Sequence, residues 1–497
     1  MSLVPNGLES VVRGLVSTAN TLQSGDPLPL AAAQHREDLG RNAQMDPLNA
    51  VVRRTSVKGV TRGSLTGLRL TVKDSIAIGG IPMSCGSAAL QGFVPSGDST
   101  VVARVLNEGA EVAAVTNMDD LAFAGSGETS YYGPTRNPFN PALLSGGSSG
   151  GAAASLHYGL FDAAIGTDQG GSVRVPASWC GVIGLKPTHG LIPYTGVAAM
   201  EPSLDHVGVL ATSVQTLAQV LAAIAGRDGQ DLRQHKIPVD LMRNFEASDF
   251  AAVDLRRWRL GVVDATVSTA SKPVKEAFKR VLDSIESLGG SVTRSDFNPS
   301  AFGPITTGLF LEGVLHTIQG VRTNFGGTHF EWVEFTDALR EGVEREVNRL
   351  SPTFVASLRA AENLHRSAPG TCYSRALAAR ERLRTAYSTA LDNVDFLVEP
   401  TVPSLPLPVG GAEDAQTVAD RGWSVLTITG HANAAGLPAI SLPLGTHDGL
   451  PVGVMITARP WQEQALLSFA HACEHLIGWN NGITPESTVR CNTQFHD

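Results

Sequence analysis

Two clusters of glycine and serine lie close together in the sequence and could hold a nucleophile. The first spans residues 146–151 and reads Gly-Gly-Ser-Ser-Gly-Gly, and the second spans residues 166–172 and ends in Gly-Gly-Ser. Glycine lets a substrate come close to the backbone, and successive N–H groups in such turns form concavities that bind anions. A serine in such a turn, with a base within reach, can attack a carbonyl carbon. The two clusters therefore indicate acyl-transfer chemistry.

The first cluster has two other interpretations. A Gly/Ser-rich run is often a flexible linker, but the runs 142–144 and 152–154 beside it are apolar, which disfavours a linker. The cluster also matches the G-x-S-x-G elbow of α/β-hydrolases, in which Ser148 or Ser149 would be the nucleophile with a histidine partner. That elbow follows directly on a strand, and residues 140–145, which contain a proline, predict a poor strand. The elbow stays a minor alternative.

Lys73 is the candidate base. It ends the apolar run 68–72, which predicts a short strand and therefore a buried position. An ordinary lysine has a pKa of about 10.4, so it serves as a base at neutral pH only where burial keeps it neutral. Without the two serine clusters, a solvated lysine beside Asp74 would be the simpler interpretation.

Other chemistries lack their motifs. The sequence contains neither the phosphate loop G-x-x-x-x-G-K-[ST] nor a G-x-G-x-x-G fingerprint with a following acid, so nucleotide binding is unsupported. The five cysteines are widely spaced and form no C-x-x-C pair, which favours reduced thiols and disfavours a structural zinc site. His471 and His475 are four residues apart on a predicted helix, but a metal site would need a third ligand that the sequence does not indicate. We therefore expect no bound metal.

Composition excludes several classes of protein. The chain has 497 residues, a net charge of -9 and 42% hydrophobic residues, so it is long enough for a large core and too apolar to be disordered. Acidic residues outnumber basic ones and no Lys/Arg run is present, which argues against nucleic-acid binding. Residues 1–5 lack the order of a secretory signal, so we expect a cytoplasmic protein.

Residues 137–226 are unusually poor in charge, with six charged side chains in 90 residues. Such a stretch is either buried or membrane-spanning. Its longest uncharged run, 137–161, is broken by prolines and glycines, whereas a spanning helix needs about 20 mostly apolar residues. We therefore expect a buried core of loops and short elements, and no membrane association.

The order strand, helix, strand occurs twice. Short apolar runs predict the strands, and apolar residues three and four apart predict the helix between them. Asp98 or Ser99 would cap the first helix, and glycines would end both helices. This order predicts an α/β protein. The expected segments are 68–72, 98–109 and 111–116 in the first unit and 260–263, 274–288 and 291–293 in the second.

Eight short runs together resemble the amidase signature family. They extend from about residue 45 to about residue 480, and the stretch from about 230 to 395 is where that family varies. The resemblance implies a Ser-cisSer-Lys hydrolase without a metal or cofactor. It also implies an α/β fold, a single domain whose central mixed, twisted β-sheet is covered by α-helices on both faces. The runs are 72–74, 116–118, 146–151, 166–177, 180–188, 203–205, 436–439 and 449–453.

We expect four segments within this domain. Residues after 227 are richer in charge and in amphipathic helix, as in 333–350 and 375–391, and short apolar strands return at 396–400 and 439–444 before a closing helix over 464–477. The segments are an N-terminal helical segment (1–60), the signature core with the catalytic residues (61–227), a variable helix-rich part (228–395) and a C-terminal segment that returns to the sheet (396–497).

The resemblance assigns a role to four residues. Ser172 matches the nucleophile, Ser148 the bridging serine that follows a cis peptide bond, Lys73 the base and Ser149 a supporting hydroxyl. The proton of Ser172 would pass through Ser148 to Lys73 and return by the same path to the leaving amine.

Backbone N–H groups of the second cluster would hold the oxyanion of the tetrahedral intermediate. Asp168 and Arg174 flank this cluster in a segment with almost no other charge. Because an isolated buried charge is very costly, we expect the two to pair and to support the loop without taking part in the chemistry. The expected oxyanion donors are Gln169, Gly170, Gly171 and Ser172.

The sequence gives less information about the substrate than about the catalytic residues. Tyr131, Tyr194, Met200 and Trp423 are candidates for an apolar pocket, although core packing is the alternative for each. We expect a small, hydrophobic or aryl carboxamide as substrate, with release of ammonia or an amine. Carbamates, anilides and esters are alternatives because the same acyl-enzyme route handles them.

A partner-dependent enzyme is a further alternative. The glutamine amidotransferases of this family often have glutamine after the arginine of the second cluster, where this chain has Val175. Gln169 and the run 194–196 resemble stand-alone bacterial amidases more closely, and the habit of the family suggests a homodimer. Residues 114–117 lack a lysine that is typical of the family at this point, but that position is not part of the catalytic trio.

Overall fold

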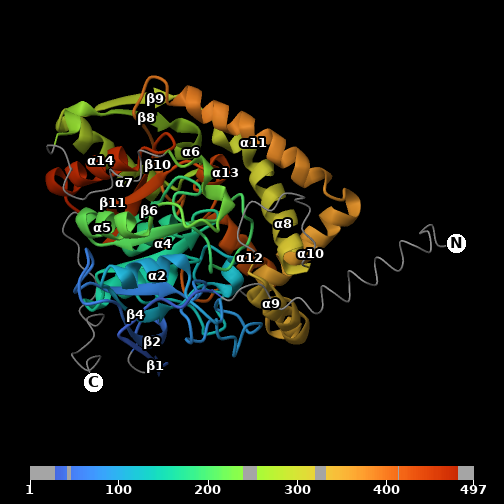
Figure 1. Cartoon of the computed structure of the whole chain (residues 1–497). Coiled ribbons are helices and arrows are strands. Elements are labelled where there is room, and N and C mark those ends of the chain that lie inside the picture. The colour runs from blue at the N-terminus through green and yellow to red at the C-terminus, as the bar shows by residue number, and fades with distance from the viewer. Residues whose placement is uncertain (1–27, 42–45, 239–253, 320–331, 412–413, 480–497) are drawn as a thin grey trace.

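A single mixed β-sheet runs through the molecule. The computed structural model describes residues 28–41, 46–238, 254–319, 332–411 and 414–479. Within them, twelve strands form one sheet in the order β1-β2-β4-β3-β5-β7-β6-β11-β12-β10-β8-β9 (Figure 1). Strands from all parts of the chain join it, which agrees with a single domain. The strands are β1 (His35–Gly40), β2 (Val51–Lys58), β3 (Arg69–Lys73), β4 (Glu111–Thr116), β5 (Ala163–Asp168), β6 (Ile183–Lys186), β7 (His206–Ala211), β8 (Arg259–Val263), β9 (Ser291–Ser295), β10 (Phe396–Pro400), β11 (Ala439–His447) and β12 (Leu450–Thr457).

Parallel pairing is confined to two parts of the sheet. β3 lies parallel to both β4 and β5, and β8 lies parallel to both β9 and β10. The other neighbouring strands are antiparallel. The two parallel parts coincide with the two strand-helix-strand units expected from the sequence, because a parallel pair needs a crossover connection. The mixed sheet is therefore confirmed.

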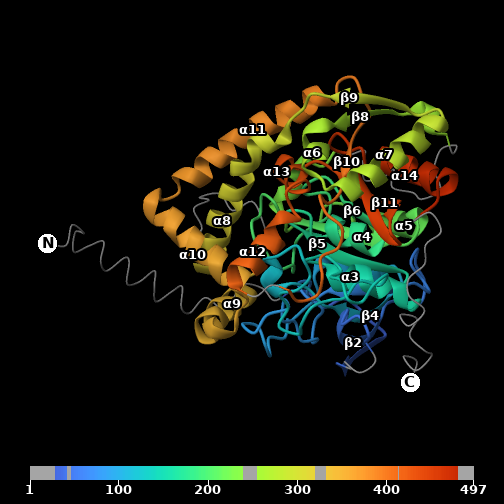
Figure 2. The same ribbon diagram turned by 180° about the vertical axis from the view of Figure 1, so that it is seen from behind.

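Helices cover both faces of the sheet (Figures 1 and 2). Neighbouring strand residues point to opposite faces. Ile165 belongs to the apolar core that includes residues of α2, α5, α7 and α14, and Ala164 belongs to the core that includes residues of α3 and α4. The helices are α2 (Thr100–Asn107), α3 (Gly150–Ser155), α4 (Arg174–Cys180), α5 (Val214–Ile224), α6 (Asp264–Thr269), α7 (Lys272–Ser287), α8 (Gly303–Gln319), α9 (Val333–Glu346), α10 (Pro352–Ser367), α11 (Thr371–Ala390), α12 (Ala415–Ser424), α13 (Gly430–Ala435) and α14 (Glu463–Leu476).

A further helical layer lies beside the sheet. α8, α9, α10 and α11 run along one side of the molecule in both views (Figures 1 and 2). Their apolar residues pack with Cys85, Met118 and Leu121, which belong to the segments that leave the carboxyl ends of β3 and β4. The carboxyl ends of these strands are therefore closed off from solvent.

The charge-poor segment 137–226 is a buried core, as expected. Of its six charged side chains, Asp162 is exposed and the other five are buried. Among the helices that the structure describes, none combines the length and the apolar character needed to cross a bilayer.

The N-terminal segment differs from the expectation. Residues 1–27 lie outside the described residues, and the described part of 28–60 contains the strands β1 and β2 where a helical segment was expected. β2 is rich in β-branched residues and pairs with β4, which favours a strand. The other segment boundaries, at residues 227 and 395, stay predictions.

Ser99, and not Asp98, caps α2. The Ser99 hydroxyl accepts a hydrogen bond from the N–H of Val102, while the Asp98 carboxylate pairs with Arg36.

We expect Ser99→Ala to lower the free energy of unfolding by about 1 kcal/mol, because loss of the cap leaves an N–H of the first turn without a partner. Urea titration followed by circular dichroism measures this change. Ser287→Ala, at the exposed end of α7, is the control and should change the stability little. Equal effects of the two substitutions would contradict the capping role.

Candidate active site

Lys73 lies at the carboxyl end of β3 and is completely buried. β3 runs between β4 and β5, so the lysine side chain lies inside the protein. Its Nζ donates hydrogen bonds to Ser148 Oγ and to Thr167 Oγ1, both at 2.8 Å. The structure thus joins two of the predicted catalytic residues and adds Thr167, which sequence reasoning did not identify.

The surroundings of Lys73 favour its neutral form. Burial lowers the pKa of Lys73 to about 7, although the negative charges of Asp119 and Asp168 oppose this shift. A substantial fraction of the side chain is therefore unprotonated at neutral pH. A neutral amine that contacts a serine hydroxyl can accept a proton from it.

Ser148 follows a cis peptide bond from Gly147. A side chain at Gly147 would not fit, because its Cβ would lie 1.9 Å from a carboxylate oxygen of Asp119. Asp119 is itself held by the N–H groups of Gly127 and Thr129, each at 3.0 Å. The glycine is thus required by the close approach of a buried carboxylate.

Ser149 connects the two glycine-serine clusters. Its N–H donates to the carbonyl oxygen of Ser172 at 3.0 Å, and its hydroxyl donates to the carbonyl oxygen of Thr167 at 3.1 Å. Ser172 is buried, and within the described residues its hydroxyl makes no hydrogen bond to Ser148. The link from Ser148 to Ser172 therefore stays a prediction.

Asp168 and Arg174 form a fully buried ion pair beside the Ser172 loop. The Nε and Nη2 atoms of Arg174 each lie 3.0 Å from a carboxylate oxygen of Asp168. Burial alone would raise the pKa of Asp168, but the Arg174 charge and its hydrogen bonds lower that pKa to about 2. The carboxylate is thus ionised at neutral pH, as its position next to a guanidinium requires.

The ion pair changes the expected set of oxyanion donors. The N–H of Gly171 donates to an Asp168 oxygen at 2.7 Å, so it is occupied. The N–H groups of Gln169, Gly170 and Ser172 have no partner in the described part of the chain. Four donors were expected, and three of them are available. The sequence indicated a glycine at position 171 but not the direction of its N–H.

Two residues from the C-terminal part of the chain complete this loop, and sequence reasoning missed both. Thr429 donates from its hydroxyl to the carbonyl oxygen of Gly170, and its own carbonyl oxygen accepts from Arg174 at 3.0 Å. Asn433, on α13, donates to Asp168 at 2.9 Å and accepts from Arg174 at 2.6 Å. They lie just before the run 436–439, which was the one nearby signal in the sequence.

A small apolar cavity of about 30 Å³ lies next to Thr167 and Gln169. Met200, a predicted pocket residue, lines it, whereas Tyr131, Tyr194 and Trp423 do not. Most of its lining is apolar, with contributions from the segment after β4 and from helices α8 to α10. The apolar lining residues include Met118, Leu121, Phe123, Ile318, Phe335, Leu339 and Phe354.

The three other predicted pocket residues have different surroundings. The Tyr194 hydroxyl accepts from Gln169 Nε2 at 2.7 Å and donates to the carbonyl oxygen of Ala198, so Tyr194 holds the Gln169 side chain in place. Tyr131 is exposed, and its hydroxyl accepts from Arg349. Trp423 packs edge-on against another aromatic ring.

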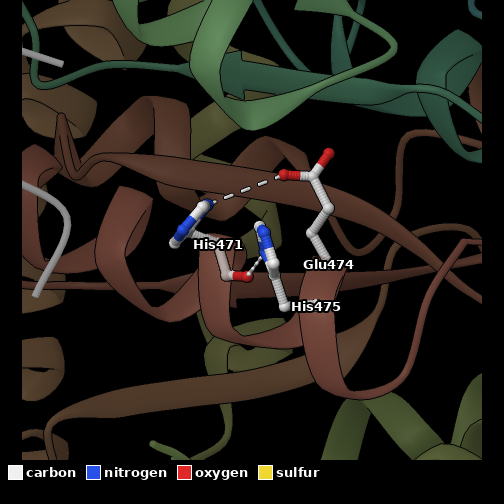
Figure 3. A group of neighbouring side chains, drawn as sticks. All are labelled: His471, Glu474 and His475. Atoms are coloured by element: carbon white, nitrogen blue, oxygen red, sulfur yellow. Dashed lines mark hydrogen bonds and ion pairs between the residues drawn. The ribbon is translucent and has the colours of Figure 1, made fainter. Parts of the chain in front are cut away.

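His471 and His475 have a third group beside them. Glu474, on the same helix α14, lies with them (Figure 3), and one potential ligand atom from each residue lies within 4.8 Å of the others. The Glu474 carboxylate also accepts from the N–H of Val214, which begins α5, and from the ring N–H of Trp479. His475 Nδ1 bonds to the carbonyl oxygen of His471. These contacts give the cluster a structural role in joining α14 to α5.

Comparisons with known proteins identify the family. The family model named Amidase matches residues 46–467. A polypeptide of the glutamyl-tRNA(Gln) amidotransferase from Halobacterium salinarum, its A subunit, is 34% identical over 439 residues, which are 86% of this chain and 99% of that protein. The crystal structure of the corresponding polypeptide from Thermotoga maritima superposes with a TM-score of 0.71 at 28% identity, covering 90% of this chain and 91% of that one.

A second solved structure is a peptide amidase in complex with the competitive inhibitor chymostatin. It superposes with a TM-score of 0.69 at 28% identity and covers 85% of this chain and 86% of that one. The match of the family model, the relatives and the shared fold agree with the lysine-serine arrangement at the carboxyl end of β3. The chain therefore belongs to the amidase signature family.

Proposed function

We propose that the protein is a serine amidohydrolase that cleaves the C–N bond of a carboxamide through an acyl-enzyme. The observation that carries this proposal is the hydrogen bond of buried Lys73 to Ser148, in a loop that Ser149 ties to Ser172. A lysine with its pKa near 7 is a usable base. The α/β-hydrolase alternative uses a histidine as its base, so it gives no role to the buried Lys73 beside Ser148.

The reaction would proceed in balanced steps. Ser172 gives its proton to Ser148, which passes its own proton to neutral Lys73, while the Ser172 oxygen bonds to the carbonyl carbon. The resulting oxyanion accepts hydrogen bonds from the N–H groups of Gln169, Gly170 and Ser172. The proton returns through Ser148 to the nitrogen, the C–N bond breaks and ammonia or an amine leaves. Water then hydrolyses the ester by the same relay.

The apolar side chains beside Gln169 favour an apolar acyl group over a charged one, and the cavity of about 30 Å³ would have to widen to admit such a group. The lining of the cavity contains no lysine, arginine, aspartate or glutamate. The buried Oε1 of Gln169 has no partner in the described part of the chain, so it can accept a hydrogen bond from the amide N–H of a substrate. We therefore place a small, hydrophobic or aryl carboxamide first. Anilides, carbamates and esters would follow the same route.

A glutamine-dependent amidotransferase component is the second candidate. The sequence comparisons favour it over a stand-alone amidase, because the A subunits of glutamyl-tRNA(Gln) amidotransferases from Halobacterium salinarum and Methanosarcina acetivorans are 34% and 33% identical over 86% and 85% of this chain. Glutamine carries an ammonium and a carboxylate group that need charged or strongly polar partners when they leave water. The apolar cavity lining and Val175 in place of the frequent glutamine argue against this substrate.

Ser172→Ala should lower kcat/KM for any accepted amide by at least about 1000-fold, because the nucleophile is lost. Ser155→Ala is the matched control, since Ser155 is a buried serine on α3 whose hydroxyl bonds within the helix. Steady-state kinetics on both purified variants measures the difference. Retention of wild-type rates by the Ser172 variant would remove the nucleophile assignment.

The pH profile should report the deprotonation of Lys73. Because the neutral amine is the active form, kcat/KM should rise with pH through about 7 and level off above it. Lys73→Arg, which keeps a positive charge at all accessible pH values, should lower the rate by about 100-fold or more and abolish this rise. A wild-type profile that stays flat while the pH is raised from acidic to alkaline, from folded protein, would argue against a lysine base.

A substrate panel on the purified chain separates the two candidates. Apolar aliphatic and aryl amides should be hydrolysed by the chain alone, with glutamine a poor substrate, and chelator treatment should not change the rates. Size-exclusion chromatography on the same sample checks the proposed homodimer. Activity on glutamine that appears only when partner proteins are added would favour the amidotransferase component instead.

A further inference from the structure

A second cavity, of about 440 Å³, is lined by an unusual number of basic side chains. It lies between α11, the short helix η4 (Leu232–Lys236) and the loops that follow β6, α13 and β12. No aspartate or glutamate lines it, although the chain as a whole has a net charge of -9. Two histidines contribute to the lining, together with Arg233, Lys236, Arg380, Arg384 and Arg459.

Among these basic residues, Arg380 gives the strongest evidence for an anion site because its charged side chain is buried. It is 7% exposed, and it donates to the carbonyl oxygens of Ala434 and Ser203 at 2.6 and 2.9 Å. No carboxylate lies within ion-pair distance of its guanidinium in the described part of the chain. The nearby Glu201 accepts hydrogen bonds from Tyr373 and from the N–H of Ser203, and its charge acts on Arg380 only through space. Burial, and then the charge of Arg384, lowers the pKa of Arg380 to about 10.

The neighbouring basic groups are compensated only in part. Arg233 forms a buried ion pair with Asp231, Arg384 pairs with Glu381, and Arg459 pairs with Asp392. None of these three acids lines the cavity. Burial and the charges of Arg233, Arg380 and Arg384 hold the pKa of His189 well below its usual value. The cavity therefore has a positive potential, which an anion would relieve.

We propose that this cavity binds a small anion that carries a phosphate group. Guanidinium groups present planar forks of N–H donors that match phosphate oxygens, and several of them around one cavity suit a group with more than one negative charge. The volume is in the range of ordinary small-molecule sites, which is about 300 to 1,000 Å³. Arg380 is buried, which distinguishes the cavity from a solvated basic surface. Arg233 is buried too, but it donates to Asp231 and to the carbonyl oxygens of Pro202 and Asp205, so it contributes charge and no free fork.

The site is separate from the amidase centre but shares α13 with it. The carbonyl oxygens of Ala434 and Ala435, at the end of α13, accept from Arg380 and Arg384. Asn433, on the same helix, holds the Asp168 carboxylate beside the nucleophile loop. The anion would thus bind to the guanidinium groups that also fix this helix.

Isothermal titration calorimetry on the full chain tests the proposal, with inorganic phosphate, pyrophosphate and AMP as probes in a low-salt chloride buffer. At least one probe should bind with one site per chain. Arg384→Gln and Lys236→Gln should each weaken binding at least tenfold, and Arg380→Gln more strongly if it folds. Arg340→Gln, an equal charge change at an exposed position of α9, is the control and should leave binding unchanged.

Tighter binding of AMP than of phosphate would identify an organic phosphate as the ligand, and equal binding would identify the phosphate group itself. Absence of binding by all probes at millimolar concentration would overturn the proposal, and so would equal weakening by the cavity variants and Arg340→Gln. Binding of a short RNA in place of all these anions would overturn it too and assign the surface to nucleic acid. Amide hydrolysis by the unsubstituted chain is measured separately, so that failure of anion binding and failure of the proposed function are distinguishable.

Discussion

The burial of Lys73 is the constraint on which the rest of the site depends. Burial of an ammonium group costs free energy because the charge loses its hydration. The pKa of Lys73 is therefore lowered to about 7, and the side chain loses its proton near neutral pH. Its two neighbours, the hydroxyls of Ser148 and Thr167, suit both forms because a hydroxyl can donate or accept. A carboxylate in direct contact would hold the proton on the lysine and remove the base. The carboxylates of Asp119 and Asp168 make no direct contact with Lys73, so they only reduce the lowering of its pKa.

The Asp168 carboxylate affects two basic side chains, Arg174 and Lys73, in different ways. Asp168 contacts Arg174 directly, and this contact lowers the pKa of Asp168 and keeps its carboxylate ionised. The same carboxylate affects Lys73 only through space. A fixed ion pair thus shapes the backbone around Ser172, while the lysine remains free to change its protonation state. Titratable groups with separated pKa values in this way are typical of active sites.

Local patterns in the sequence predicted much of the structure. Strands β4 and β10 coincide with the expected segments because their apolar runs have sharp ends. The two glycine-serine clusters lie close together in the chain, so the sequence could indicate them as one site, and the structure joins them through Ser149. Strand β1 could not be predicted in this way. Its sequence, His-Arg-Glu-Asp-Leu-Gly, is mostly polar, and its conformation depends on pairing with β2.

The part of the site that sequence reasoning missed comes from distant residues. Asn433 contacts Asp168 across 265 positions of the chain, and no spacing rule connects an asparagine on a short helix with such a partner. The occupied N–H of Gly171 could not be predicted either, since a sequence shows that glycine is present and not where its N–H points. Both depend on the tertiary packing of α13 against the loop.

The long separation between these partners has a consequence for how the protein is made. Lys73, Ser148 and Ser172 all lie in roughly the first third of the chain, whereas the carbonyl oxygen of Thr429 and the amide of Asn433 are needed around Arg174. A ribosome delivers the N-terminal part first. A growing chain that has reached only α11 therefore contains Lys73, Ser148 and Ser172 and still lacks the groups that hold the loop around Arg174. The loop can take its final form only after α13 has been synthesised.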